Sequence, residues 1–207
     1  MFLPLLLLLL TSSQEIVSSS HPSTASLMAV EEIMNLLQSG ENKDYIGENI
    51  SQLEHALQCA QLAKNANADE EIIIASLLHD IGHSVTLNGA LTMNGYGALH
   101  HEIIGANYVL EKNFSTKVGE LIKGHVCAKR YLTYSDSKYY ATLLDASKET
   151  LKMQGGPMTA QEAQEFKQDP LFEQKLIMRF WDEQAKQIGW VVTPLESYKE
   201  LLLRTIY

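Results

Sequence analysis

Apolar residues recur every three or four positions over most of the chain after residue 24, which is the spacing of helices that bury one face. The first such stretch, 25–37, places Val30, Ile33 and Leu37 on one side, and Gly40 follows it as a stop. No segment alternates apolar and polar residues as a half-buried strand would, so we predict an all-α fold. The same spacing predicts further helices at 51–66, 101–112, 115–127, 138–153, 160–167, 170–187 and 195–204.

One further predicted helix, 69–79, is apolar on every side. It begins at Asp69, a favourable N-cap residue, and carries the run Ile-Ile-Ile-Ala at 72–75, which is typical of a fully buried helix. The stretch 84–98 that follows is rich in glycine and asparagine and poor in long apolar residues. We predict that 84–98 is a loop over the functional site.

The N-terminus differs in composition from the rest. Residues 2–10 form an unbroken apolar run, and serine and other polar residues dominate 11–24. Nine apolar residues fall well short of the ~20 that span a bilayer, so we predict no stable membrane span. The run has the length of a signal-peptide core, but no Lys or Arg precedes it. We therefore predict a leader at 1–23, one domain at 24–207 and a cytoplasmic location, with secretion as the alternative.

Length, charge and cysteine usage narrow the class of protein. The 207 residues are 45% hydrophobic, which fits one domain of roughly 100–200 residues. Sixteen basic against twenty-five acidic residues give a net charge of −9, so we expect no nucleic-acid partner. The two cysteines, Cys59 and Cys127, lie outside any CxxC motif, which excludes a disulfide framework and a cysteine-based structural zinc site. None of these features fixes the oligomeric state.

Four of the seven histidines occur at intervals of 24, 22 and 24 residues, on four different predicted helices or helix ends: His55, His79, His101 and His125. Asp80 follows His79 directly, at the end of the most buried predicted helix. A buried carboxylate needs a cation. Imidazoles and carboxylates that converge from several helices are typical ligands of iron, manganese or zinc, so the pattern predicts a metal site.

The same residues resemble a known family. His55, the doublet His79-Asp80 and the distant Asp182 match the H…HD…D pattern of the HD-domain superfamily, which is a helical bundle with metal at its centre. His101 and His125 resemble the variant with six ligands and two metals. Six further segments resemble the HD-domain mixed-valent diiron oxygenases that cleave phosphonates: YIGE at 45–48, QLEH at 52–55, ASLLHDIG at 75–82, GHV at 124–126, AKRYL at 128–132 and QGGPM at 154–158.

The resemblance covers about 42–198 and implies a central dinuclear site that holds Fe(II) and Fe(III), with O2 as co-substrate. By the family pattern, Asp80 bridges the two irons, and the other ligands are His55, His79, His101, His125 and Asp182. The implied reaction is oxidative cleavage of the carbon–phosphorus bond of 2-amino-1-hydroxyethylphosphonate, or an N-methylated analogue, to glycine, or a betaine-type product, and phosphate. The implied partner is therefore a small organophosphonate.

The resemblance also implies substrate contacts and catalytic residues. Catalytic roles fall on Tyr45, Glu48 and Lys129, with Tyr45 and Glu48 forming a lid on a segment that contains Gly47. Substrate contacts fall on Glu48, His83, Lys129, Ser147, Thr150 and Gln154, with Arg130 as a weaker candidate. From the residues alone, Lys129-Arg130 is equally typical of a solvated helix face, Tyr45 of ordinary packing, and Glu48 of a helix N-terminus.

Three other functions stay open at this point. The first is a phosphohydrolase, in which a metal-bound hydroxide attacks a phosphate ester. The second is a ring-cleaving diiron oxygenase of the inositol oxygenase type. The third is a helical binding module without catalytic activity, for which absence of bound metal would be the expected sign.

Overall fold

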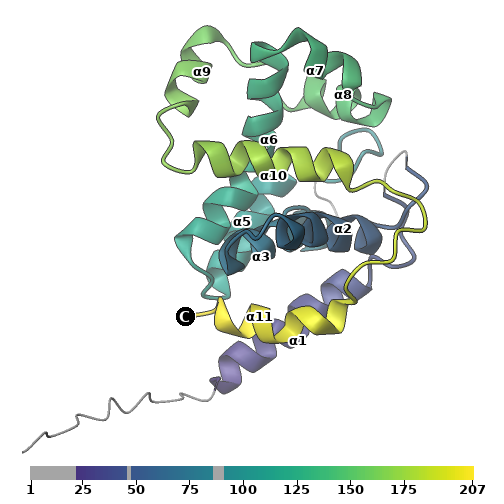
Figure 1. The fold of residues 1–207 in the computed structure, drawn as a ribbon, viewed down its shortest axis with the longest axis vertical. Helices are drawn as coiled ribbons and strands as arrows, with labels where there is room; N and C mark the ends of the chain where they lie inside the picture. Colours follow the sequence, from purple (N-terminus) through teal and green to yellow (C-terminus); the bar gives the residue numbers. More distant parts are fainter. Residues whose placement is uncertain (1–21, 46–47, 86–90) are drawn as a thin grey trace, which may run out of the picture.

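The computed structural model describes residues 22–45, 48–85 and 91–207, and these ranges form helices without any strand (Figure 1). The all-α prediction is therefore confirmed. Three isolated β-bridges join neighbouring loops or a loop and the C-terminus. The helices are α1 (Thr24–Gln38), α2 (Gln52–Asn65), α3 (Glu70–Leu78), α4 (Gly82–Val85), α5 (His101–Glu111), α6 (Thr116–Ser135), α7 (Ser137–Thr142), α8 (Asp145–Met153), α9 (Ala160–Phe166), α10 (Phe172–Gln184), the 3-10 helix η1 (Leu195–Tyr198) and α11 (Lys199–Arg204).

Local sequence explains where six of the twelve helices in the described ranges begin, because a side chain caps each of these six. The side chain of Ser51 accepts a hydrogen bond from the backbone N–H of Glu54, whose carboxylate accepts one from the N–H of Ser51, so α2 starts with a capping box. Thr159 and Glu162 repeat this arrangement at α9. Asp69 caps α3 by accepting from the N–H of Ile72. Each cap satisfies an amide at a helix start.

Two apolar clusters hold the bundle together. The larger one joins side chains of α1, α2, α3, α5, α6, α10 and α11, and α3 runs through its interior. The smaller one joins the C-terminal half of α6 with α7, α8, α9 and the start of α10. Figure 1 shows α7, α8 and α9 gathered at one end of the molecule and α1 with α11 at the opposite end. The functional residues lie between these two ends.

Two predicted boundaries are wrong. Helix α6 does not end at Cys127 but continues to Ser135. Lys129 is itself buried, and so are Tyr131 and Leu132 after it, so the helix still packs against its neighbours beyond the polar pair at 129–130. The predicted helix 138–153 is broken at Leu143, which has extended backbone and packs in the smaller cluster. The chain must leave the helix to bury that side chain, so two helices replace one.

The remaining boundaries shift by a few residues. The predicted helix 170–187 is shorter at both ends, and the segment 195–204 starts as a 3-10 turn. The predicted loop 84–98 is wrong at its start, because Ser84 and Val85 form the end of the short helix α4. Residues 91–98 are a loop as predicted, and 86–90 lie outside the described residues. The predicted leader lies outside them too, except for Pro22 and Ser23, so the leader and the domain limits stay predictions. None of the helices in the described ranges is long and apolar enough to cross a membrane.

Candidate metal centre

The structure brings together all six side chains that the sequence suggested as metal ligands. They come from five helices and lie in the interior between the two ends of the bundle, with five of the six buried. The end of helix α3 supplies two of them, and four neighbouring helices supply one each. The six are His55 on α2, His79 and Asp80 after α3, His101 at the start of α5, His125 on α6 and Asp182 on α10.

The two carboxylate oxygens of Asp80 face different histidine pairs. Its Oδ2 lies 3.4 Å from Nε2 of His79 and 3.9 Å from Nε2 of His55. Its Oδ1 lies 3.4 Å from Nε2 of His101 and 3.7 Å from Nε2 of His125. Within the pairs, the Nε2 atoms are 3.2 Å and 3.0 Å apart. A carboxylate so placed is able to bridge two cations, one beside each pair.

Backbone carbonyls fix the orientation of the four imidazoles. A carbonyl oxygen only accepts, so each Nδ1 that contacts one must carry the hydrogen, and each Nε2 presents a lone pair to the centre of the cluster. Lone pairs 3.0–3.2 Å apart repel one another unless a cation or a proton lies between them. The ring nitrogens and their acceptors are His55 with Ala185 (2.8 Å), His79 with Ser76 (2.9 Å), His101 with Ala98 (3.3 Å) and His125 with Ile122 (2.7 Å).

Asp182 contributes an oxygen that lacks a partner. Its Oδ1 is buried, lies 3.4 Å from Nε2 of His55, and accepts no hydrogen bond from the described residues. Its Oδ2 accepts from the guanidinium of Arg179, three residues earlier on α10, and Arg179 also donates to the Tyr139 hydroxyl at 2.9 Å. Burial raises the pKa of the Asp182 carboxyl, but Arg179 more than offsets this, so the pKa lies well below its usual range. The free oxygen is therefore ionised and suited to a metal ion.

The same charges act on His79. Burial lowers its pKa, while the carboxylates of Asp80 and Asp182 raise it more strongly, to about 9. A proton on this ring would occupy the place that the carboxylates offer to a cation. Orientation, burial and charge thus agree that the cluster fits bound metal ions.

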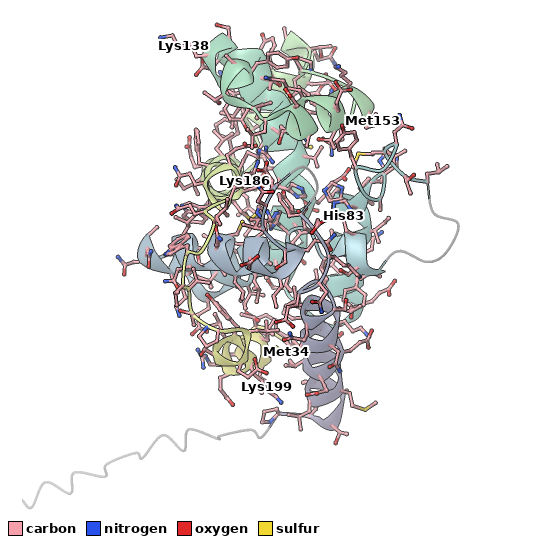
Figure 2. The ribbon with its side chains drawn as sticks, turned by 90° about the vertical axis from the view of Figure 1, so that its right-hand side faces the viewer. Met34, His83, Lys138, Met153, Lys186 and Lys199 are labelled. Atoms are coloured by element: carbon pink, nitrogen blue, oxygen red, sulfur yellow. The ribbon has the colours of Figure 1, made fainter. Side chains whose placement is uncertain are left out.

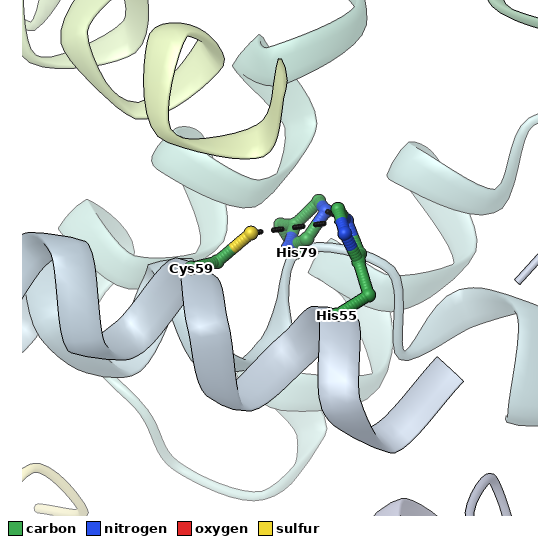
Figure 3. Close-up of side chains that lie close together, drawn as sticks. All are labelled: His55, Cys59 and His79. Carbon is green, nitrogen blue, oxygen red and sulfur yellow. Dashed lines mark hydrogen bonds between the residues drawn. The ribbon is translucent and has the colours of Figure 1, made fainter. Parts of the chain in front are cut away.

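Cys59 is a further candidate ligand that the sequence did not single out. It lies one turn after His55 on α2, and its Sγ is 3.7 Å from His55 Nε2 (Figure 3). Together with His55 and His79 it forms a group of three possible donors. Burial raises the pKa of the thiol well above its usual value, so without a metal it stays protonated. A lone cysteine carries no sequence signal, and only the fold brings it to the cluster.

A cleft with about 930 Å³ of empty space, including its opening to solvent, leads to the cluster. The side chains that line it include members of α2, α4, α6, α8 and α10 and of the loops before α2 and α5. All six side chains suggested as substrate contacts lie in its wall. They are Glu48, His83, Lys129, Ser147, Thr150 and Gln154.

Lys129 is the most unusual of these side chains. It lies one helical turn after His125, is 4% exposed, and its ammonium donates to the Thr150 hydroxyl at 3.0 Å. In the part of the chain that the structure describes, no carboxylate lies within ion-pair distance of it. Burial lowers its pKa to about 7. A buried ammonium with one neutral partner is an incomplete anion site.

Other side chains of the cleft add neutral polar groups. Nδ1 of His83 accepts from the backbone N–H of Ala98 at 3.0 Å, so in the neutral ring the hydrogen lies on Nε2. That ring stacks on His101 with centroids 4.0 Å apart. The carboxamide oxygen of Gln154 is buried without a hydrogen-bond partner among the described residues. Arg130, by contrast, donates to the Gly156 carbonyl and to Glu162, and does not line the cleft.

The side chains suggested for a lid lie at the other side of the cluster. The ring of Tyr45 stacks on His55, with centroids 3.8 Å apart and an angle of 15°. Oε1 of Glu48 lies 3.8 Å from the ammonium of Lys186, which also lines the cleft and which the sequence did not indicate. The suggested hinge Gly47 lies outside the described residues.

The fold and the cluster define a class: an all-helical protein whose core carries a His- and Asp-rich site suited to two metal ions. The family model described as HD domain matches residues 53–168. An uncharacterized protein of Acanthamoeba polyphaga mimivirus is 39% identical over 84% of this chain and 80% of its own length.

Two enzymes are similar to the same extent. The [1-hydroxy-2-(trimethylamino)ethyl]phosphonate dioxygenase (glycine-betaine-forming) of Leisingera caerulea is 39% identical over 76% of this chain and 80% of its own length. The hydroxymethylphosphonate dioxygenase of Gimesia maris is 40% identical over 78% and 81%. The chain therefore belongs to the HD-domain family, in its diiron oxygenase group, as its motifs indicated. It is accordingly an oxygenase.

Proposed function

We propose that this chain is an iron-dependent dioxygenase that cleaves the carbon–phosphorus bond of a 1-hydroxyalkylphosphonate. The observation that carries the proposal is the buried ammonium of Lys129, in the same cleft as a cluster suited to two metal ions. A phosphonate dianion is the kind of ligand that such an ammonium lacks. Both similar enzymes are named for substrates of this class.

Within that class, 2-amino-1-hydroxyethylphosphonate or an N-methylated analogue is the first candidate. Its ammonium group matches the carboxylate of Glu48, which lines the same cleft. The products would be glycine, or a betaine-type product, and phosphate. One O2 accounts for every atom of these products, because one oxygen completes the carboxylate and the other completes the phosphate. The reaction therefore needs no further reductant.

The candidate metals are an Fe(II)/Fe(III) pair, with Asp80 shared between them. When bound, the irons would supply Lewis acidity toward the substrate oxygens and the redox chemistry that O2 requires. The inward Nε2 lone pairs and the free Oδ1 of Asp182 support bound metal ions, and the similarity to two phosphonate dioxygenases favours iron among the metals that this ligand set suits. The residues proposed to hold the irons are His55, His79, Asp80, His101, His125 and Asp182.

The anion end of the substrate would lie against α6 and α8. Lys129 would donate to one phosphonate oxygen, and Thr150, already hydrogen-bonded to Lys129, would hold that ammonium in place. His83 would donate from Nε2, Ser147 on α8 from its hydroxyl, and Gln154 at the end of α8 from its amide nitrogen. These contacts neutralise and orient the phosphonate, which is what the protein contributes when metals carry the redox chemistry.

The other side of the cluster would close over the substrate. Tyr45 covers the ring of His55, and burial raises its pKa well above the usual value, so its phenol stays protonated. We assign Tyr45 to shielding the cluster from water before substrate binds. Glu48, three residues later, would contact the substrate's amine.

The test is release of phosphate from 2-amino-1-hydroxyethylphosphonate by purified protein with ferrous iron, with and without O2. We expect phosphate and glycine in equal amounts, one O2 consumed for each, and no product in the anaerobic sample. The Asp80→Ala variant serves as the metal-deficient control. Phosphate release that continues without O2 would contradict an oxygenase and favour the phosphohydrolase.

The role of Glu48 has its own test. Glu48→Gln keeps the size and hydrogen-bonding capacity of the side chain but removes its charge, so we expect kcat/KM to fall for the aminated substrate and to change little for hydroxymethylphosphonate. Equal losses for both substrates would assign Glu48 to the structure of the cleft instead.

A further inference from the structure

Glu48 does not face the cleft as an isolated carboxylate. The ammonium of Lys186 lies 3.8 Å from its Oε1, and both residues line the cleft. Their side chains are only 10% and 15% exposed, so little water separates the two charges. Figure 2 shows Lys186 at about the same level of the molecule as His83, between the two ends of the bundle. A cation of the protein therefore already occupies part of the place assigned above to the substrate's amine.

Hydrogen bonds on both sides of Lys186 fix its backbone to α2. The carbonyl of Ala185 accepts from Nδ1 of His55, and the backbone of Gln187 makes two hydrogen bonds with the side chain of Gln58, at 2.8 Å and 2.9 Å. The backbone is thus fixed on both sides of Lys186. The fold therefore determines where the Lys186 side chain starts and directs it toward Glu48, unlike the side chain of a mobile surface lysine.

The ammonium has a second acidic neighbour that keeps it in place. It donates to Oε2 of Glu183 at 3.3 Å, and Glu183 in turn contacts Arg179, which binds Asp182. A line of alternating charges therefore runs from the wall of the cleft to a candidate metal ligand. Because Glu183 anchors Lys186 independently of Glu48, the ammonium does not need Glu48 in order to stay buried.

On the proposed function, we infer that Lys186 is a specificity-determining residue that limits how strongly the enzyme prefers aminated over neutral 1-hydroxyalkylphosphonates. A substrate ammonium must share Glu48 with Lys186 or displace Lys186 from it, and the positive charge of Lys186 repels it. A neutral substituent meets neither effect. Lys186 thereby holds the substituent end of the cleft close to neutral and admits substrates of both kinds.

The experiment compares Lys186→Met, which keeps most of the side-chain length without the charge, with Lys186→Arg as the charge-preserving control. The measured quantity is the ratio of kcat/KM for 2-amino-1-hydroxyethylphosphonate to that for hydroxymethylphosphonate. We expect Lys186→Met to raise this ratio at least about tenfold, because Glu48 is left unpaired, and Lys186→Arg to leave it within about threefold. In a Glu48→Gln background the effect of Lys186→Met should shrink to the part that comes from like-charge repulsion alone, because Glu183 still holds the ammonium in the cleft.

Two results would overturn the inference: a ratio that Lys186→Met leaves unchanged, or a shift that is as large in the Glu48→Gln background as in the wild-type protein. Iron content and circular dichroism check that the variants fold, and Lys186→Gln replaces Lys186→Met if the latter does not. The Kd of each phosphonate, measured without O2, gives the same ratio independently of turnover. If the wild-type protein turns over neither substrate, the proposed function fails, whereas turnover with an unchanged ratio rejects only the role of Lys186.

Discussion

Replacing Lys129 with methionine should stabilise the substrate-free protein and at the same time remove phosphonate binding. Burial lowers the pKa of Lys129 from 10.5 to about 7, and each unit corresponds to about 1.4 kcal/mol, so the buried charge costs roughly 5 kcal/mol at pH 6. The Lys129→Met variant loses the hydrogen bond to Thr150, worth about 1 kcal/mol. The expected gain in unfolding free energy is therefore of the order of 4 kcal/mol.

The gain should depend on pH in a defined direction. Between pH 7 and 10.5 the unfolded wild-type chain binds one proton more at this lysine than the folded chain does, so wild-type stability rises with pH across that window. Lys129→Met lacks this contribution. The advantage of the variant should be full at pH 6 and gone near pH 10.

Urea unfolding of chelator-treated protein, followed by tryptophan fluorescence at pH 6, 8 and 10, measures the difference. Lys123→Met is the matched control, because Lys123 lies on the same helix but is exposed, and its loss should change stability by less than about 0.5 kcal/mol. Calorimetry with phosphonate and iron-loaded protein measures binding. A Lys129→Met variant that is less stable than wild type at pH 6, or that still binds phosphonate equally well, would refute the reasoning.

Two other substitutions test the cluster and its surroundings. Asp80→Ala should reduce bound iron from about two ions per chain to none, because the two oxygens of Asp80 face both histidine pairs. Elemental analysis measures the iron content, and retention of two irons would contradict a bridging role. Gly97→Ala should weaken phosphonate binding at unchanged iron content. Gly97 has φ +88°, and an added Cβ would lie 2.6 Å from the ring of His83, so the ring would have to move. Unaltered Kd values would show that His83 does not contact substrate.

Helix starts were predictable because they depend on local sequence. Asp69 and Ser51 satisfy amides three residues away, and such caps are visible in a single sequence. The end of α6 was not predictable, because Lys129 interrupts the apolar stripe in the sequence although its side chain is buried. A polar residue that the fold buries looks, in the sequence, like the end of a helix or a solvated face.

The histidine cluster was predictable for a different reason. Several histidines on separate helices, with a doublet at the end of the most apolar helix, have few structural explanations besides a shared ligand. Arg179, Lys186 and Cys59 gave no comparable signal. Each lies within four residues of a candidate ligand, on or just beyond a helix with ordinary composition, and only tertiary packing shows which groups they contact.

The positions of the buried charges bear on how a small substrate would be oriented. Lys129 follows His125 by one helical turn on α6. Glu48 follows Tyr45, whose ring stacks on His55. The ammonium of Lys129 is therefore on the side of the pair that contains His125, and the carboxylate of Glu48 on the side of the pair that contains His55. A molecule with an anionic and a cationic end would therefore gain most when its anion lies on the His125 side. Exchanging the ends would put like charges together at both sides, a cost that grows as the cleft loses water. With Glu48 partly neutralised by Lys186, the anion must contribute most of this orientation, and a phosphonate without any amine would then still bind in the same direction.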